Sequence, residues 1–274
     1  EELLAAIGQR PAIDPERGDA VRRSHEPNSR LVAGVYSTRP AVLGMGNHAM
    51  STARDSTYFN QTFPYTRYNT NAWYGGSYPA GANDNSYQLI TAGGEDWLFL
   101  HLAYDPPAGV RAWAGTVLKA HPSRKAVITT HSFLDSATAR SAAGTNVWND
   151  VVVPNDNVIA VLCGHISAEA CRTDYIGGRA VHQILSDYQG RTNGGDGWLR
   201  ILGFSPARGQ FFVETYSPTL GQYERDPNSQ FALGYRASGF LVLGTAAGVS
   251  AAGGTASLVW PDLDVFTRHE WYVK

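Results

Sequence analysis

The alternation of apolar and polar residues in the middle of the chain predicts strands and helices that follow one another. Residues 86–92 and 97–104 have the pattern of two strands, and Gly93-Gly94 between them predicts a hairpin. Residues 106–120 carry apolar side chains at helical spacing. Asp105, which directly precedes that segment, is expected to cap the helix.

Further along, short apolar runs are typical of buried strands. They comprise residues 126–130 and 158–162, with a short helical or extended segment at residues 148–153. From Ile166 onward the pattern predicts consecutive strands, at residues 180–185, 198–204 and 210–216. Alternating elements followed by consecutive strands suit two packed sheets with helices outside.

The two ends of the chain differ from this middle part. Residues 1–7 have the apolar spacing of an amphipathic helix, residues 30–36 predict a second short helix, and residues 41–45 predict a buried strand. Residues 238–274 predict three strands joined by a turn rich in glycine and alanine. Because a full β-sandwich needs about seven strands, this tail corresponds to only part of one.

Composition narrows the class of protein. The chain has 274 residues, 43% hydrophobic and 17% charged, as expected for one large globular domain or for one domain with a small appendage. A formal net charge of −2 predicts no surface for nucleic acid or for an anionic membrane. The two cysteines, Cys163 and Cys171, either form one bridge or remain thiols.

Residues 51–85 form a long irregular segment with many aromatic side chains among glycine, asparagine and proline. Loops of this length are usually functional or packed on themselves. Two interpretations are open. In the first, the aromatic residues between Tyr58 and Tyr78 line a substrate cleft and stack on a base or sugar. In the second, they pack on themselves and shield the sheets from water.

Candidate chemistry lies in three turns, each directly after a predicted buried strand. The turns contain Asn47-His48, His131 and His165. Strand ends are where α/β sheets place ligand-binding groups. Imidazole nitrogen and amide oxygen are good ligands for divalent metals such as zinc, manganese and iron. A lone histidine in such a turn is more often structural, but the three turns together predict a shared metal site.

The order of these turns resembles the calcineurin-like metallophosphoesterase family, and in particular a bacterial, secreted branch of it. The family blocks G-N-H, strand-end His and G-H are matched by Gly46-Asn47-His48, His131 and Gly164-His165. Gly18-Asp19, which lies 28 residues before Gly46, resembles the family's G-D block. The stretches at residues 194–198 and 216–218 also resemble that branch.

The resemblance covers residues 1–233 and carries expectations about the fold. It implies a four-layer αββα sandwich of two mixed β-sheets flanked by helices, which belongs to the α/β (α+β) class. Residues 238–274 resemble the first strands of a fibronectin type III-like domain. A secreted or extracellular location is implied by the same resemblance.

The resemblance also implies a site and a reaction. Asp19, Asn47, His131 and His165 would be metal ligands, and His48 would be the catalytic residue that gives a hydrogen bond or proton to the leaving-group oxygen. The implied reaction is the hydrolysis of phosphate mono- or diesters by a metal-bound hydroxide. Its cofactors would be divalent ions (Mn, Fe, Zn or Mg), and its partner would be a small phosphoester.

The sequence departs from the family pattern at positions that serve one metal. It contains no D-x-H motif, and Ser167 stands where the family has the second histidine of G-H-x-H. In the family those positions serve one of two metals, while the four ligands named above serve the other. We therefore expect one metal to bind well and a second poorly or not at all.

These departures leave a second function open, and they raise the question of which roles His182 and His101 have. The alternative is a catalytically degenerate metallophosphoesterase-like module that binds carbohydrate or another surface through its aromatic segment. His182 is a candidate for replacing a lost ligand, although an ordinary strand position is more common. His101, in the middle of a predicted strand, is expected to be a buried structural histidine.

Overall fold

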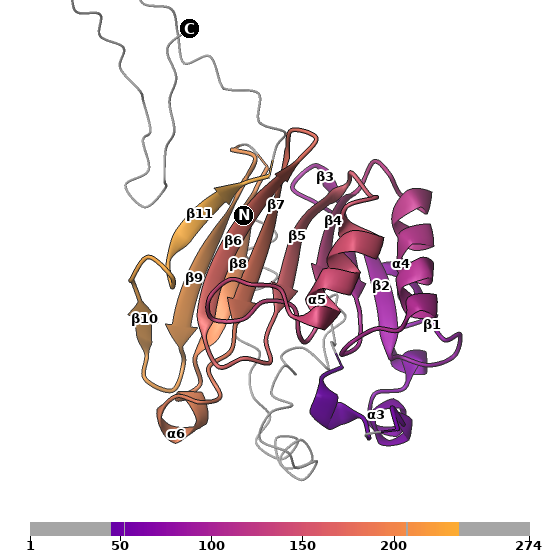
Figure 1. The fold of residues 1–274 in the computed structure, drawn as a ribbon, viewed down its shortest axis with the longest axis horizontal. Helices are drawn as coiled ribbons and strands as arrows, with labels where there is room; N and C mark the ends of the chain where they lie inside the picture. The colour runs from indigo at the N-terminus through magenta and orange to yellow at the C-terminus, as the bar shows by residue number, and fades with distance from the viewer. Residues whose placement is uncertain (1–44, 52, 207, 236–274) are drawn as a thin grey trace, which may run out of the picture.

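The computed structural model describes residues 45–51, 53–206 and 208–235, which form two β-sheets packed face to face with helices outside (Figure 1). The predicted helices at residues 1–7 and 30–36, most of the predicted strand at 41–45, Asp19 and the tail at 238–274 lie outside the described residues. The boundary between the two predicted domains therefore stays a prediction.

The larger sheet is mixed and has seven strands in the order β1-β2-β3-β4-β5-β7-β6. Its strands are β1 (Tyr74–Tyr78), β2 (Asn85–Ala92), β3 (Glu95–His101), β4 (Lys125–Thr129), β5 (Val158–Cys163), β6 (Glu169–Ile176) and β7 (Arg179–Ser186). The four central strands β3, β4, β5 and β7 run parallel. Their carboxyl ends consequently meet at one edge of the sheet, where the candidate site lies.

The predicted hairpin is confirmed. Strand β2 pairs antiparallel with β3, and Ala92 lies opposite Glu95 across a two-residue turn. Gly93 and Gly94 both have positive φ values, of 60° and 75°. This conformation suits a tight hairpin turn and is the reason for two glycines there.

The smaller sheet has four strands, and its described pairs are all antiparallel. They are β8 (Leu199–Ser205), β9 (Gln210–Ser217), β10 (Gln222–Glu224) and β11 (Phe231–Gly234). Strand β9 lies at the centre and pairs with the other three. Together with the larger sheet, this arrangement confirms the expected α/β (α+β) class with two packed sheets.

Aromatic side chains fill the space between the sheets. Trp97 of β3 packs edge-on against Phe204 of β8, with ring centroids 4.6 Å apart. Phe211 of β9, fully buried, stacks on Tyr235. Fully burying one such side chain contributes roughly 1.5–3 kcal/mol, so this layer holds the sheets together.

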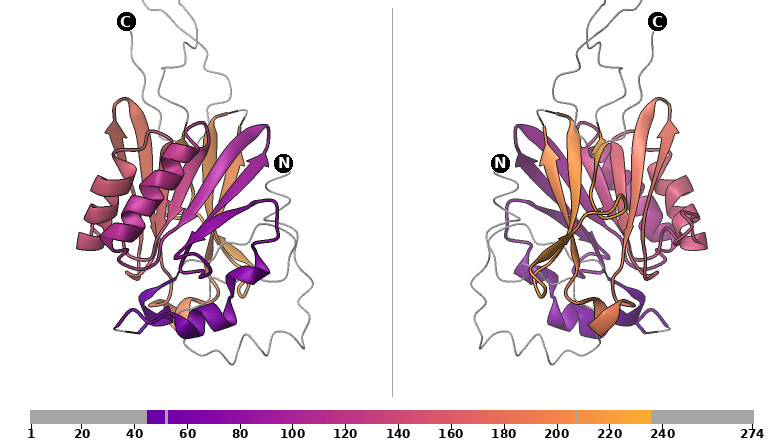
Figure 2. Two further views of the ribbon diagram at one scale, coloured as in Figure 1. Left: turned by 90° about the vertical axis from the view of Figure 1, so that its right-hand side faces the viewer. Right: turned by 90° about the vertical axis from the view of Figure 1, so that its left-hand side faces the viewer.

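Helices cover the opposite face of the larger sheet (Figure 2). They are α4 (Ala108–Ala120), α5 (Ala142–Val147) and the π-helical turn η3 (Trp148–Val152). Gly144 of α5 packs against the backbone of Phe133, where an added Cβ would lie 2.3 Å from the carbonyl oxygen. The expectation that Asp105 caps α4 is wrong: Pro107 is the N-cap residue, and no side chain caps the helix. Two prolines separate Asp105 from the first helical turn, which places its carboxylate too early to reach the N–H groups.

The aromatic segment packs mainly on itself. It contains α3 (Thr57–Thr62) and η2 (Tyr65–Arg67). The short 3-10 helix η1 (Asn47–Ala49) packs against it through Ala49. Phe59 and Tyr68 are buried together with Met45 and Ala103. Tyr58, in contrast, is 82% exposed. The interpretation that this segment shields the sheets therefore accounts for most of it.

The state of the two cysteines and the character of the remaining helices complete the description of the fold. Cys163 and Cys171 are both free thiols, on strands β5 and β6, which β7 separates. The last described helix, α6 (Thr192–Gly195), is a single short turn. Among the helices of the described residues, none has the length and apolar character needed to cross a membrane.

Candidate functional site

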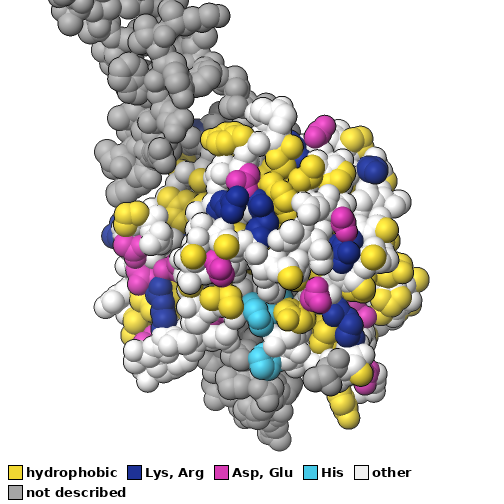
Figure 3. Space-filling model, in the orientation of Figure 1, with side chains coloured by type: hydrophobic (Ala, Val, Ile, Leu, Met, Phe, Trp, Pro, Cys, Tyr) yellow, Lys and Arg dark blue, Asp and Glu magenta, His cyan; other side chains and the backbone are white. Residues whose placement is uncertain are grey.

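The candidate site lies where the parallel strands end. Thr129 ends β4 and Cys163 ends β5, so that His131 and His165 each follow a strand by two residues. The backbone N–H of Gly164 donates to the carbonyl of His131 over 2.9 Å, which ties the two turns together. Histidine side chains reach the surface along the lower edge of the face shown in Figure 3.

Three of the four predicted metal ligands converge on one point. Nε2 of His131 lies 2.7 Å from Oδ1 of Asn47 and 3.1 Å from Nδ1 of His165. Asn47 begins η1, 84 residues before His131 in the sequence. The structure therefore brings these three side chains together, as predicted. The fourth predicted ligand, Asp19, lies outside the described residues.

Burial keeps His131 neutral. Burial, the largest cause, and the neighbouring His165 and His48 together lower the pKa of His131 to about 4. Gly46 makes the close packing possible, because a Cβ on that residue would lie only 3.0 Å from Cε1 of the His131 ring. A neutral imidazole offers a lone pair, which a metal ligand requires.

His165 is held in an uncommon backbone conformation. Its φ is +75°, in the left-handed region that non-glycine residues seldom adopt. Backbone strain of this kind persists only where the surrounding structure enforces it, and it is frequent at functional sites. Here the conformation turns the chain sharply after β5 and brings Nδ1 towards His131.

Tyr104 packs over both histidines. Its ring centroid lies 5.8 Å from that of His131 and 5.4 Å from that of His165. Its backbone N–H donates to the carbonyl of Met45 over 2.9 Å, which anchors the turn that carries Asn47. Tyr104 is not among the site residues predicted from the sequence. No pattern in the sequence marks it, because its place depends on strand β3 running parallel to β4 and ending at the same edge.

His48 lies beside the cluster and is exposed. It follows Asn47 in η1 and is close enough to His131 to lower its pKa. The hydrogen bonds of the described residues include none to the imidazole of His48. Its ring nitrogens are thus available to a bound molecule.

The donor set fits a divalent metal. Ligands about 2.0–2.2 Å from a common metal ion, at right angles to one another, stand roughly 3 Å apart. The two measured separations, 2.7 and 3.1 Å, have that size. A ring nitrogen carries either a proton or a lone pair, but not both. Nε2 of His131 is therefore poorly matched as a hydrogen-bonding partner to two neighbours at once, Oδ1 of Asn47 and Nδ1 of His165. A cation shared by the three atoms would remove the mismatch.

Ser167 is engaged elsewhere. Its hydroxyl accepts a hydrogen bond of 2.8 Å from the backbone N–H of Gly190. The packing is tight, since a Cβ on Gly190 would lie 2.5 Å from the Ser167 oxygen. The position that corresponds to the second histidine of G-H-x-H thus holds a short side chain bonded to the neighbouring loop.

The other buried histidines have structural partners. In His101, which is fully buried, Nδ1 lies 2.5 Å from Oγ1 of Thr129 and Nε2 lies 2.6 Å from Oε1 of Gln88. In His182 the two ring nitrogens face the hydroxyl of Thr173 and the carbonyl of Gly234. The expectation for His101 is met, and His182 does not replace a lost ligand because both of its nitrogens are engaged.

A second group of acidic residues lies away from this edge. Ligand atoms of Glu169, Glu224 and Asp226 lie within 4.8 Å of one another. However, Arg191 pairs with Glu169 and with Glu224, and Arg200 also pairs with Glu169. Two guanidinium groups therefore already balance most of this charge, and the group is a structural ion-pair network.

Comparison with known proteins gives a relative whose description states no activity. No model of a known protein family matches the chain. A protein of Bacillus subtilis (strain 168), described as uncharacterized protein YvnB, is 36% identical over 192 residues. That match covers 67% of this chain but only 14% of the relative, so this chain spans a small part of the length of the protein it matches.

Proposed function

We propose that this chain is a metallophosphoesterase of the calcineurin-like type, which hydrolyses phosphate mono- or diesters with a bound divalent metal. The observation that carries the proposal is that Oδ1 of Asn47 and Nδ1 of His165 both lie within 3.1 Å of Nε2 of His131. These residues come from three separate turns, and no helix or strand periodicity would bring them together by itself. The proposed cofactor is Mn, Fe, Zn or Mg.

Each proposed site residue has its own role in the reaction. Asn47, His131 and His165 would hold the metal, with Asp19 as a further proposed ligand. When bound, a divalent ion lowers the pKa of water and neutralises charge on phosphoryl oxygens. Water oxygen forms the new bond to phosphorus and releases a proton to the solvent, and the bond from phosphorus to the ester oxygen breaks. His48, exposed and without a partner among the described residues, donates the proton that the departing alcohol needs.

We further propose that one metal binds tightly and a second weakly or not at all. Ser167 supports this proposal, because its hydroxyl is bonded to Gly190 and its side chain is too short to act as the missing imidazole. A site with one metal activates water less than a site with two. Slow hydrolysis is therefore expected.

Metal analysis and hydrolysis assays test the proposal together. Protein purified without chelator should contain about one equivalent of metal per chain, and His131→Ala should lose it because the central ligand is gone. Hydrolysis of p-nitrophenyl phosphate and of its bis ester, with and without Mn²⁺, then separates monoesterase from diesterase. A chain that binds no divalent metal in any assay contradicts the proposal.

A second candidate function is a module that binds without catalysis. The engaged Ser167 and the 70% exposed Tyr175 and 82% exposed Tyr58 favour it, since exposed aromatic rings bind sugars well. Metal binding with no hydrolysis of either ester, together with retention on a polysaccharide, would support this candidate. A secreted location remains part of the proposal and is tested by fractionating the source cells.

A further inference from the structure

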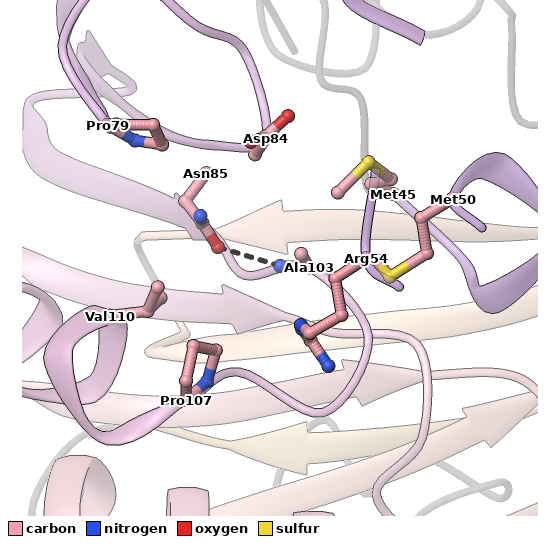
Figure 4. A pocket seen from close by; sticks show the side chains of 9 residues that line it. All are labelled: Met45, Met50, Arg54, Pro79, Asp84, Asn85, Ala103, Pro107 and Val110. Atoms are coloured by element: carbon pink, nitrogen blue, oxygen red, sulfur yellow. Dashed lines mark hydrogen bonds between the residues drawn. The ribbon is translucent and has the colours of Figure 1, made fainter. Parts of the chain in front are cut away.

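A small pocket lies next to the candidate metal site. Its volume is about 180 Å³. Met45 and Met50, which flank the turn with Asn47 and His48, form one wall, and Ala103, directly before Tyr104, forms part of the floor. The remaining lining residues are Arg54, Pro79, Asp84, Asn85, Pro107 and Val110 (Figure 4). Two lining residues, Met45 and Met50, thus belong to the same short segment as Asn47 and His48.

Arg54 gives this pocket an available positive charge. Its guanidinium donates one hydrogen bond, of 2.7 Å, from Nη2 to the carbonyl of Tyr104. No ion pair of Arg54 occurs in the part of the chain that the structure describes. A guanidinium has five N–H donors, so most of them remain free for a ligand. In Figure 4 the guanidinium points into the space between Met50 and Pro107.

The other polar groups of the pocket are already engaged. Asn85 donates to the carbonyl of Tyr78 and accepts from the N–H of Ala103. Asp84 accepts a hydrogen bond of 2.6 Å from Asn60, and its carboxylate points away from Arg54 in Figure 4. Asp84 keeps its negative charge at a distance from the guanidinium, and Arg54 is the cationic group among the lining residues.

Tyr104 connects Arg54 with the metal site. Its carbonyl accepts the bond from Arg54, and its ring contacts His131 and His165. A single residue therefore sets the position of the guanidinium relative to the two imidazoles. A substrate whose phosphoryl group lies at the histidines can extend past Tyr104 towards Arg54.

We propose that this pocket binds the alcohol portion of the ester, and that Arg54 selects alcohol portions that carry an anionic group. The inference rests on the proposed phosphoesterase function. The apolar walls fit a short carbon chain, and the unpaired guanidinium fits a carboxylate or a second phosphate at its end. The size of the pocket limits the alcohol portion to a few heavy atoms beyond the ester oxygen.

Three phosphate esters that differ in terminal charge test this selection. Phosphoglycolate ends in a carboxylate, 2-hydroxyethyl phosphate in a neutral hydroxyl, and phosphoethanolamine in an ammonium group. A hydrogen bond to a charged partner contributes enough for roughly tenfold discrimination. We expect kcat/KM to be about tenfold higher for phosphoglycolate than for 2-hydroxyethyl phosphate, and lowest for phosphoethanolamine.

Variants assign the preference to Arg54. Arg54→Gln should make the three esters nearly equal, whereas Arg54→Lys keeps the charge and should keep part of the preference. Arg67→Gln removes an exposed arginine outside the pocket and should change nothing. Circular dichroism and the thermal midpoint of each variant show whether the fold is intact.

A binding measurement separates failure of the pocket from failure of the proposed function. Chelator-treated protein is titrated calorimetrically with phosphoglycolate and with 2-hydroxyethyl phosphate, and the first should bind about tenfold more tightly, but not in Arg54→Gln. If this preference is seen without hydrolysis of any ester, the pocket proposal stands and the phosphoesterase proposal fails. Hydrolysis without the charge preference, a preference that survives in Arg54→Gln, or a preference for phosphoethanolamine overturns the pocket proposal alone.

Discussion

At the scale of single residues, the environment of each histidine decides its role. Nε2 of His131 faces two ligand atoms of other residues, whereas the nitrogens of His101 face a hydroxyl and an amide oxygen that complement a neutral ring. The difference is one of hydrogen-bond matching. A matched buried imidazole is structural, and an unmatched one at a strand end is a candidate ligand.

His48→Ala should lower hydrolysis without removing the metal. His48 is the proposed proton donor, and general acid catalysis contributes typically about 10²–10⁴-fold. The loss should be large for an alkyl phosphate, whose alcohol leaves only with a proton, and smaller for p-nitrophenyl phosphate, whose phenolate leaves unaided. Steady-state kinetics on both esters and metal analysis check this. Parallel loss of metal and activity would instead assign His48 to the metal shell.

His101 should make stability depend on pH. Burial lowers the pKa of His101 to about 3, from an ordinary value of 6.5. Between these values the unfolded state binds the proton and the folded state does not, so the free energy of unfolding falls as pH decreases through this range. The contribution is about 1.4 kcal/mol per pH unit, or roughly 2 kcal/mol at pH 5. Urea unfolding of the wild type and of His101→Gln, from pH 7.5 to pH 5, measures it.

The matched control keeps the titrating ring. Gln88→Met removes one hydrogen-bond partner of His101, at Nε2. It should lower stability at every pH while the slope with pH stays close to that of the wild type. Equal slopes in the wild type and in His101→Gln would show that His101 does not carry this dependence.

At the scale of elements, sequence pattern was sufficient for most elements whose determinant is local. The hairpin follows from its alternation and from Gly93-Gly94, and α4 follows from its apolar spacing. The start of α4 was missed in detail, because Pro106-Pro107 separates Asp105 from the helix and no rule of spacing alone reveals it. The short strands β10 and β11 have too few residues to show a periodicity.

The turn before η1 gives a prediction at this scale. Gly46 has φ −84°, which alanine adopts readily, but a Cβ there would lie 3.0–3.4 Å from three atoms of the His131 ring. Gly46→Ala should therefore displace the ring and weaken metal binding about tenfold or more, as changes next to ligands do. Thermal stability should change little.

The control for Gly46→Ala is a glycine with free space around it. No atom lies within 4 Å of a Cβ built on Gly234. Gly234→Ala should leave both metal affinity and stability near their wild-type values. Competition with a chromogenic chelator measures the affinities, and an unchanged affinity in Gly46→Ala would show that the ring tolerates the methyl group.

At the scale of the whole molecule, the candidate site depends on sequence order and on topology together. The order of Asn47, His131 and His165 led to the prediction of a shared site, and the parallel strands β4 and β5 explain why two of them meet. The roles of Tyr104 and Arg54 could not be predicted in this way. They depend on where β3 ends relative to β4 and on how the backbone at Met45 and Tyr104 pairs, and such long-range contacts leave no local pattern.

The contact between the two sheets gives the last prediction. Glu169 of β6 in the larger sheet pairs with Arg200 of β8 in the smaller sheet, and their side chains are only 7% and 6% exposed. Arg191, Tyr188 and Ser229 also bond to the Glu169 carboxylate. Glu169→Gln removes the charge but keeps the shape, and it leaves the buried guanidinium of Arg200 without its counter-ion.

Breaking a buried ion pair from one side costs about 3–5 kcal/mol, so Glu169→Gln should lower the free energy of unfolding by that amount in urea. Asp150→Asn is the control, because Asp150 pairs with Arg111 at a side chain that is 50% exposed and should cost less than about 1 kcal/mol. Metal content should be unchanged in both variants, since the network around Glu169 is balanced by arginines. A loss of metal in Glu169→Gln with stability intact would instead make the acidic group a cation site. Stability and metal binding thus belong to separate parts of the molecule: the packing between the sheets, and the edge where the parallel strands end.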